Sequence, residues 1–249
     1  MKKTYFLSDA HLGLTLVENP HEHQMKLVRF LDSIKNDAEA IYLMGDIFDF
    51  WFEFKRYIQP GFEALFSKLK EIAGAGISVH FFTGNHDMWT FGYLEKETGL
   101  IIHRQPEIVT IANKTFFLAH GHKLGKRNFL TKIMHAIFEN RFLQKMFFLF
   151  FPPKLGLRLG YAWSRSSRKK HCTYDNNYLG ENNEFLVQFA KRHLAQQPSI
   201  DFFVFGHRHI LLNLQLKNQS RILILGDWIN QFSYAVFDGE TIMTEHFEE

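Results

Sequence analysis

Short apolar segments alternate with longer amphipathic ones at the start of the chain, and each short segment stops at a cluster of polar residues. Residues 4–8, 40–44 and 77–82 are predicted to be buried strands, while residues 24–34 and 62–73 carry apolar side chains at helical spacing. The resulting order, β-α-β-α-β, predicts an α/β fold with a parallel sheet. Because binding sites in such sheets form at the carboxyl ends of the strands, the polar clusters mark the expected site.

The rest of the chain divides into a helical block and a β-rich block. Between residues 122 and 199, three segments have the pattern of helices: 130–150, 155–171 and 183–195. The predicted strands outside this block are 108–112, 115–119, 201–205, 211–216, 221–225, 234–237 and 241–246, the last four forming a terminal antiparallel set. We therefore predict a core of residues 1–122 and 199–249 and a helical insertion, the lid, at residues 123–198.

Five short motifs of Asp, His, Asn and Gly follow the predicted strands. In chain order they are Asp9-Ala10-His11, Gly45-Asp46-Ile47-Phe48-Asp49, Gly84-Asn85-His86-Asp87, His120-Gly121-His122 and Gly206-His207-Arg208-His209. Carboxylates and imidazoles suit Mn²⁺, Fe or Zn²⁺, and the lack of cysteine ligands argues against a structural zinc site. Alternate residues of an extended chain point the same way, so Asp9 and His11 are expected to reach one ion, as are His207 and His209 if the backbone stays extended there. A single motif of this kind often serves only packing, but five of them in this order favour metal binding.

Two metal ions close together need a shared anion, and Asp46 is the expected bridge because it follows the second of three adjacent strands. Two cations roughly 3.5–4 Å apart can clamp a phosphoryl oxygen and lower the pKa of a bridging water to near neutrality. The hydroxide so formed would attack phosphorus in line with the departing oxygen. The motifs therefore predict a two-metal phosphoesterase.

The set of motifs resembles the calcineurin-like metallophosphoesterase superfamily, whose pattern is D-x-H, G-D-x-x-D, G-N-H-D/E, H and G-H-x-H. The resemblance covers essentially the whole chain and implies a four-layer α/β/β/α sandwich with two divalent metal ions, Mn²⁺ being the first choice. The implied ligands are Asp9, His11, Asp46 and His209 for the first metal, and Asp46, Asn85, His120 and His207 for the second. It also implies that His86 binds the phosphate oxygen and protonates the leaving group, that Asp87 orients His86, and that Asp49 supports a ligand from behind.

Three further stretches resemble a narrower family, the UDP-2,3-diacylglucosamine pyrophosphatases of lipid A biosynthesis. They are the aromatic residues of segment 45–51, Gly226-Asp227-Trp228, and the basic tract 165–170. That resemblance implies a helical lid that holds the acyl chains, and hydrolysis to UMP and 2,3-diacylglucosamine 1-phosphate. The chain departs from that family at two positions. His86 stands where the family has Arg, and His122 where it has Asp, which leaves the leaving-group chemistry and the substrate contacts of that loop open.

The predicted lid carries the residues that we expect to bind substrate, together with Asn85 and His122. Phe side chains between residues 129 and 151, Phe147 and Phe150 among them, are more than one amphipathic face requires. They indicate either a helix packed on the core or an apolar surface for acyl chains. The basic tract supplies Arg165, Ser167, Arg168, Lys169 and Lys170. These side chains would clamp a pyrophosphate, form a solvated face, or contact anionic headgroups.

Composition narrows the cellular setting. The net charge of +3 is too small to indicate a nucleic-acid partner. Cys172 is the only cysteine, so no intrachain disulfide is possible. Because a predicted strand begins at residue 4, we expect no signal peptide. The apolar run 145–151 is too short to span a bilayer. We expect a cytoplasmic enzyme, peripherally associated with the inner membrane, with a nucleotide-lipid substrate and no obligate protein partner.

Two other functions fit the motifs less well. A soluble metallophosphoesterase that acts on nucleotides, phosphodiesters or phosphoproteins would need no Phe-rich insertion. A non-catalytic binding module on the same fold could lose ligands without losing its core, yet every motif ligand and His86 are present here.

Overall fold

Two β-sheets form the centre of the protein. The computed structural model describes residues 2–14, 16–53, 57–125, 133, 136–175 and 177–248; the side chains of residues 148 and 165–175 lie outside the description. One sheet has the order β11-β10-β1-β2-β3-β4 and the other β5-β6-β7-β9-β8. The strands are β1 Lys3–Leu7, β2 Ala38–Leu43, β3 Ser78–Phe82, β4 Ile101–His103, β5 Glu107–Ile111, β6 Lys114–Ala119, β7 Phe202–Phe205, β8 Leu211–Gln215, β9 Arg221–Leu225, β10 Ser233–Phe237 and β11 Ile242–His246.

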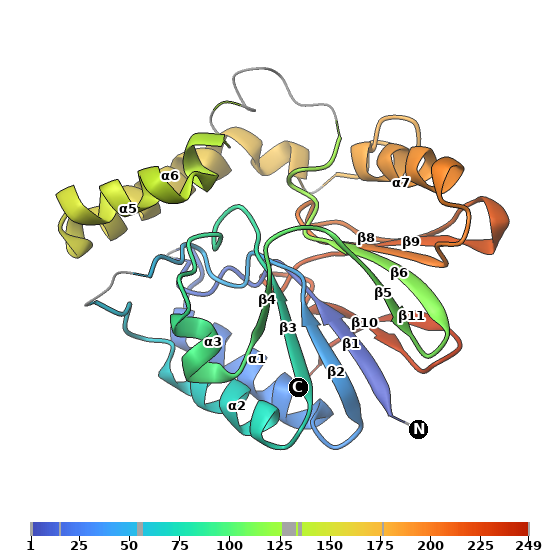
Figure 1. Ribbon diagram of the computed structural model, residues 1–249, viewed down its shortest axis with the longest axis horizontal. Coiled ribbons are helices and arrows are strands. Elements are labelled where there is room, and N and C mark those ends of the chain that lie inside the picture. The colour runs from blue at the N-terminus through green and yellow to red at the C-terminus, as the bar shows by residue number, and fades with distance from the viewer. Residues whose placement is uncertain are drawn as a thin grey trace.

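Helices cover the outer face of each sheet, which confirms the four-layer α/β/β/α sandwich (Figure 1). Helices α1 (Pro20–Ile34) and α2 (Glu63–Gly74) pack on the first sheet, and α7 (Phe185–Gln196) packs on the second. Between the sheets lies a layer of apolar side chains that includes Phe6 and Phe82 from one sheet and Phe116 from the other. The carboxyl ends of the parallel strands of both sheets lie at the same edge of the sandwich (Figure 1).

Local sequence explains where the first helix starts and which face it buries. Asn19 precedes the helix, and its side chain accepts a hydrogen bond from the backbone N–H of Glu22 at 3.1 Å. Pro20 occupies the first turn, where its missing N–H costs nothing. The buried residues Leu27, Leu31 and Ile34 recur at helical spacing and face the first sheet.

The parallel order predicted for the first strands is confirmed, since β1, β2 and β3 pair in parallel. The prediction of one terminal antiparallel set is wrong. Strands β8 and β9 pair with each other in the second sheet, whereas β10 and β11 pair in the first. Among the described elements, the helix α3 (Tyr93–Thr98), the strand β4 and a 3-10 turn at Lys217–Gln219 went unpredicted, because none is long enough to show a period.

The predicted insertion contains helices of two kinds. Helices α5 (Arg141–Phe150) and α6 (Pro153–Asp175) stand over the carboxyl ends of the strands, away from both sheets (Figure 1). Helix α7 instead buries Leu186, Val187 and Ala190 against the second sheet. We therefore propose that the lid within residues 123–198 consists of α5 and α6, and that α7 completes the sandwich.

The helix predicted at 130–150 is interrupted. Residues 136–139 are helical, and Asn140 then begins a new helix by accepting hydrogen bonds from the N–H groups of Phe142 and Leu143 at 2.9 and 3.1 Å. Across the described ranges, no helix is both long and apolar enough to cross a bilayer.

Candidate metal centre

All five motifs lie at the carboxyl ends of parallel strands, as the sequence predicts. Asp9 and His11 follow β1, Asp46 follows β2, and Asn85 follows β3 in the first sheet. His120 follows β6, and the His207–His209 segment follows β7 in the second sheet. The edge where the two sheets meet therefore brings ligands from both sheets together.

The ligand atoms of Asp9, His11 and His209 lie within 4.8 Å of one another, as do those of Asp46, His120 and His207. In the first group, Asp9 Oδ1 is 3.4 Å from His209 Nε2 and 3.7 Å from His11 Nε2.

Asp46 connects the two groups. Its Oδ2 atom is 3.2 Å from Nε2 of His120 and 3.9 Å from Nε2 of His11, which belong to different groups. Asp46 therefore lies between the two groups.

The backbone of the ligand loops is not extended, so the expected geometry is wrong for both pairs of alternate residues. Asp9 and His11 still share one ligand group, whereas His207 and His209 fall in different groups. All four residues and Asp46 have positive φ, between 46° and 70°. Such left-handed conformations are uncommon for residues other than glycine and persist where the surrounding structure enforces them. The side chains converge because each loop turns at its ligands.

Two motif glycines make room for ligand carboxylates. A Cβ atom on Gly84 would overlap Oδ1 of Asp46, and one on Gly206 would overlap the Ser8 hydroxyl beside Asp9. These positions therefore require glycine because a ligand loop from a different strand approaches closely.

Hydrogen bonds on the side away from the site orient the ligand side chains. Asp9 Oδ2 accepts from the Ser8 hydroxyl at 2.5 Å and from the His207 N–H at 2.8 Å, which leaves Oδ1 for the site. His120 Nδ1 lies 2.9 Å from the Met44 carbonyl, which leaves Nε2 for the site. Partners of this kind orient ligands and set the histidine tautomer at metal centres.

Charge is concentrated at the centre. Burial raises the pKa of Asp9. Burial also opposes ionisation of Asp46, but His120, His86 and His11 hold the pKa of that carboxyl well below its usual range. Burial disfavours the charged form of His120, but Asp46 and other carboxylates raise its pKa to about 9. The carboxylates thus stabilise a positive charge at this place, and a bound cation would supply such a charge.

The residues fit divalent metal ions. Asp9 Oδ1 and Asn85 Oδ1 are buried, yet neither accepts a hydrogen bond from any residue that the structure describes. A buried acceptor without a donor is costly, and a cation would remove the cost. Carboxylate, amide oxygen and imidazole together suit Mn²⁺, Fe or Zn²⁺.

His86 lies beside both ligand groups, and one of its ring nitrogens is within 4.8 Å of ligand atoms of His11 and Asp46. Its Nδ1 is 2.7 Å from the Asp49 carbonyl, and its ring meets that of His11 edge to face at 4.9 Å. Asp87 does not hold the ring, contrary to expectation. Its carboxylate accepts from the N–H groups of Gly84 at 2.7 Å and Ile47 at 2.8 Å, so it ties the β3 loop to the β2 loop.

Asp49 and His122 occupy the surroundings of the ligands. Asp49 Oδ1 is 3.7 Å from His11 Nδ1 and accepts from the Ser164 hydroxyl of α6 at 3.0 Å, which links the lid to a ligand.

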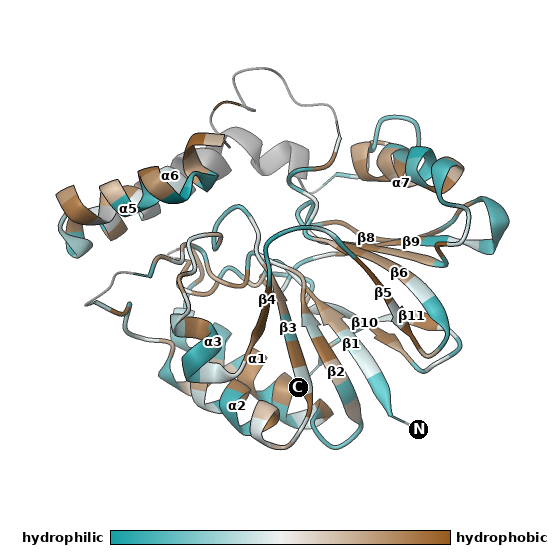
Figure 2. Cartoon of the chain, viewed as in Figure 1, coloured by the Kyte–Doolittle hydropathy of each residue, from teal (hydrophilic) through white to brown (hydrophobic). Residues whose placement is uncertain are grey.

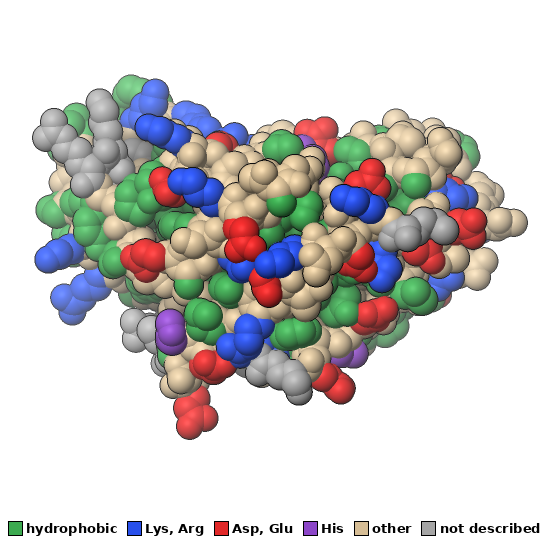
Figure 3. All heavy atoms as spheres, turned by 90° about the horizontal axis from the view of Figure 1, so that it is seen from below, with side chains coloured by type: hydrophobic (Ala, Val, Ile, Leu, Met, Phe, Trp, Pro, Cys, Tyr) green, Lys and Arg blue, Asp and Glu red, His purple; other side chains and the backbone are tan. Residues whose placement is uncertain are grey.

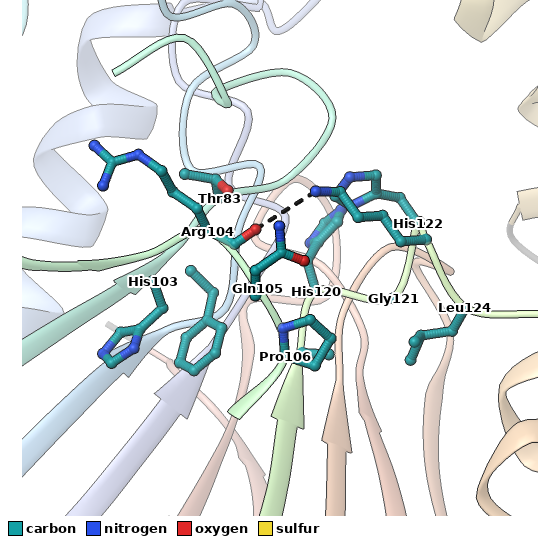
Figure 4. A pocket seen from close by; sticks show the side chains of 12 residues that line it. Thr83, His103, Arg104, Gln105, Pro106, His120, Gly121, His122 and Leu124 are labelled. Carbon is teal, nitrogen blue, oxygen red and sulfur yellow. Dashed lines mark hydrogen bonds between the residues drawn. The ribbon is translucent and has the colours of Figure 1, made fainter. Parts of the chain in front are cut away.

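His122 is buried beside His120 and lines the pocket in Figure 4, from which the Arg104 side chain points away. Burial holds the pKa of His122 well below its usual range.

The structure describes only some of the lid side chains that are predicted to bind substrate. Phe147 is half-buried and meets the rings of Phe52 and Trp89, each at 5.5 Å, whereas Phe150 is 67% exposed. The basic residues follow Ser164 on α6, and their side chains lie outside the described part of the chain: Arg165, Ser167, Arg168, Lys169 and Lys170.

The sequence did not reveal the buried ion pair that anchors the last motif. Arg208, between two ligands, contacts both carboxylate oxygens of Glu184 at 2.9 and 3.0 Å, and both side chains are almost fully buried. Arg208 also donates to the Asn177 carbonyl at 3.0 Å. The available signal was a charged residue inside a buried loop and a single Glu just before α7.

Gly226-Asp227-Trp228 supports the first ligand group. Asp227 Oδ2 accepts from the Gln231 amide at 3.0 Å, and that amide also donates to the His209 carbonyl at 2.8 Å. The Trp228 N–H donates to the Asp9 carbonyl at 3.1 Å. The motif therefore contributes to the backbone position of two predicted ligands.

The sequence profile of the calcineurin-like phosphoesterase family matches residues 2–211. The chain belongs to this family. As a calcineurin-like phosphoesterase it is a metal-dependent hydrolase, which confirms the prediction of an enzyme.

Two curated relatives of this phosphoesterase are named UDP-2,3-diacylglucosamine hydrolase. That of Porphyromonas gingivalis is 40% identical over 99% of this chain and 98% of its own length. That of Haemophilus influenzae is 26% identical over 94% of this chain and 93% of its own. These matches confirm the resemblance to the narrower family. Among solved structures, the E. coli phosphoesterase YfcE matches with a TM-score of 0.47 and 16% identity, over 96% of this chain and 90% of its own.

Replacement of Gly84 tests the close approach of two ligand loops. Gly84→Ala should displace the Asp46 carboxylate and reduce the bound metal from two ions per chain to one or none, measured by elemental analysis. Gly74→Ala is the control, because nothing lies within 4 Å of a Cβ at the end of α2. Two tightly bound ions in Gly84→Ala would show that metal binding does not depend on the close approach of Gly84 to Asp46.

Loss of the buried ion pair should be costly. Glu184→Ala leaves the Arg208 charge buried without its carboxylate partner, which typically destabilises a protein by about 3–5 kcal/mol. Glu181→Ala, which removes an exposed carboxylate paired with Lys191, should change the free energy of unfolding by about 0–1 kcal/mol. Urea unfolding of both variants measures the difference, and similar values would show that the buried pair is unimportant.

Proposed function

We propose that this phosphoesterase hydrolyses the pyrophosphate of UDP-2,3-diacylglucosamine, or of a close lipid-linked nucleotide, to UMP and 2,3-diacylglucosamine 1-phosphate. The observation that carries the proposal is an exposed apolar surface on α5 and α6, the helices that stand over the strand ends carrying the predicted metal ligands. The full-length similarity to the Porphyromonas gingivalis hydrolase supports the same substrate.

The metal-holding residues are assigned as the sequence suggested. Asp9, His11, Asp46 and His209 would hold one divalent ion, and Asp46, Asn85, His120 and His207 the other, with Mn²⁺ as our first choice. When bound, a pair of divalent ions polarises phosphoryl oxygens and lowers the pKa of the attacking water to near neutrality. The position of Asp46 Oδ2 between His11 and His120 supports its role as the shared ligand.

His86 is the proposed proton donor. Its Nδ1 is engaged with the Asp49 carbonyl, so Nε2 is the nitrogen left to donate to a phosphoryl or leaving-group oxygen. The Trp163 ring of α6 lies 5.6 Å from the His86 ring and encloses it from the lid side. Burial and the Asp46 charge raise the pKa of Asp87 to about 7, and we propose that Asp87 acts by holding the loops of Asp46 and His86 together.

The lid supplies the surface for acyl chains. Figure 2 shows apolar residues along α5 and the start of α6. The exposed ones are Phe142, Leu143, Leu149, Phe150, Phe151, Leu155 and Leu159. Contiguous exposed apolar side chains mark lipid, ligand or partner contacts more often than bare solvated surface. We propose that they receive the acyl chains while the enzyme is at the inner membrane, with Asn85, His122 and the basic tract of α6 facing the polar part of the substrate.

A substrate panel with Mn²⁺ tests this function. The wild type should hydrolyse UDP-2,3-diacylglucosamine far faster than bis-p-nitrophenyl phosphate or cyclic nucleotides. Phe150→Ser should raise KM for the lipid substrate alone at an unchanged Tm, because Phe150 is 67% exposed. Phe147→Ser, on the packed side of the same helix, should lower Tm. Equal losses on lipid and chromogenic substrates in Phe150→Ser would refute an acyl-binding surface and favour a soluble phosphodiesterase.

The role of His86 is tested by separating metal content from turnover. His86→Ala should keep both ions and lose about 10²–10³-fold in kcat, the usual effect of removing one donor at a developing charge. His86→Arg should restore part of the rate, because the guanidinium is also a donor. Loss of an ion in His86→Ala would instead make this histidine a ligand.

A further inference from the structure

A pocket of about 330 Å³ lies at the base of the lid, lined by Phe91, Gly92, Glu95, Arg104, Arg141 and Lys145. None of these residues belongs to the proposed metal ligands. Its volume is at the lower end of the range of small-molecule sites, about 300–1,000 Å³. Arg141 and Lys145 come from the lid helix α5, whereas the other four residues come from the core, so the pocket spans the contact between them.

The pocket has an excess of positive charge. Arg104, Arg141 and Lys145 contribute three cations and Glu95 one anion. The Glu95 carboxylate is 3.0 Å from Nη2 of Arg104 and therefore neutralises part of one guanidinium. Burial and the neighbouring Arg104 lower the pKa of Arg141, as expected where two like charges lie close together.

The two guanidinium groups are already held in position. Arg141 donates to the Thr90 carbonyl at 2.7 Å and lies over the Phe91 ring at 4.7 Å. Arg104 donates through Nη2 to the Thr90 hydroxyl at 2.8 Å. Its Nε is buried and has no hydrogen-bond acceptor within the described ranges. A charged donor that lacks an acceptor is unfavourable, so the Arg104 guanidinium beside the pocket has unmet hydrogen-bonding capacity.

The face of the molecule away from the lid is different. In Figure 3, which shows that face, acidic and basic side chains are interspersed. Elsewhere in the core, Lys35 and Lys68 of the α1–α2 region each contact both Asp32 and Glu71 at 2.6–2.9 Å. The charge excess in the pocket is therefore a local feature and not a general consequence of the net charge.

We propose that this pocket binds a phosphate group and thereby fastens α5 to the core. Arginine and lysine are the usual partners of phosphate oxygens, through charge-assisted hydrogen bonds. One phosphate would face Arg104 of the core and Arg141 and Lys145 of the lid helix, and would relieve the repulsion between the two guanidinium groups.

Two sources offer the same phosphate chemistry, a soluble phosphate and the headgroup of an anionic phospholipid. Lys145 is three residues after Phe142 and four before Leu149, so it lies on the same side of α5 as these exposed apolar side chains. The pocket is thus at the edge of the apolar surface of the lid, where a headgroup would be within reach.

Phosphate binding to the Mn²⁺-loaded enzyme, measured by equilibrium dialysis with labelled inorganic phosphate, tests the site. The wild type should show a binding class besides that of the metal centre. Lys145 is exposed, so Lys145→Gln should leave the fold unchanged. It should weaken this class of binding about tenfold or more, the usual effect of losing one charge-assisted hydrogen bond. Lys96→Gln removes an exposed positive charge of α3 outside the pocket and should have no effect.

Vesicle binding distinguishes the two sources. Sedimentation with phosphatidylglycerol and with phosphatidylcholine vesicles should separate Lys145→Gln from Lys96→Gln only on the anionic vesicles if a headgroup occupies the pocket. A difference between these variants in dialysis alone assigns soluble phosphate, and a difference on anionic vesicles assigns a headgroup. If the two variants behave alike in both assays, the site does not exist.

Discussion

The attraction between the buried Asp46 carboxylate and the histidines around it holds the site together. His11 and His86 reach it from the first sheet and His120 from the second, so one side chain connects loops that start in different layers. Its Oδ1 accepts the His86 N–H at 2.8 Å, and its Oδ2 faces the histidine nitrogens. Burying this charge is favourable only where positive charge stays nearby, so the arrangement depends on a cation or on protonated histidine.

The ligand loops carry a second cost, which the sandwich around them must offset. Left-handed backbone at residues such as Asp9 and His207 costs on the order of 1–3 kcal/mol each. Rigid strands before each loop and the buried Arg208–Glu184 pair after the last one provide that support. The result is a set of candidate ligand atoms that contacts between the loops hold close together.

Much of the site could be predicted because the ligands follow strands, and strands show clearly in a sequence. Once β1, β2 and β3 are assigned, their carboxyl ends must meet, and so must Asp9, Asp46 and Asn85. The turns at the ligands could not be predicted, because the left-handed backbone is imposed by contacts between loops. The same is true of Arg208 with Glu184, which are 24 residues apart, and of the allotment of β8 to β11 to two sheets. Long-range pairing of this kind leaves no periodic pattern in the sequence.

The second lid helix is tied to the core on both sides of the metal centre. Ser164 is bonded to Asp49 behind His11, and Trp163 lies against His86. Just beyond the far end of the helix, the Asn177 carbonyl accepts from Arg208, between His207 and His209. An outward movement of α6, wide enough to let a bulky product leave, would strain contacts that align ligands on both strand sets. The contacts that keep α6 in place would then also help the protein to retain its metal.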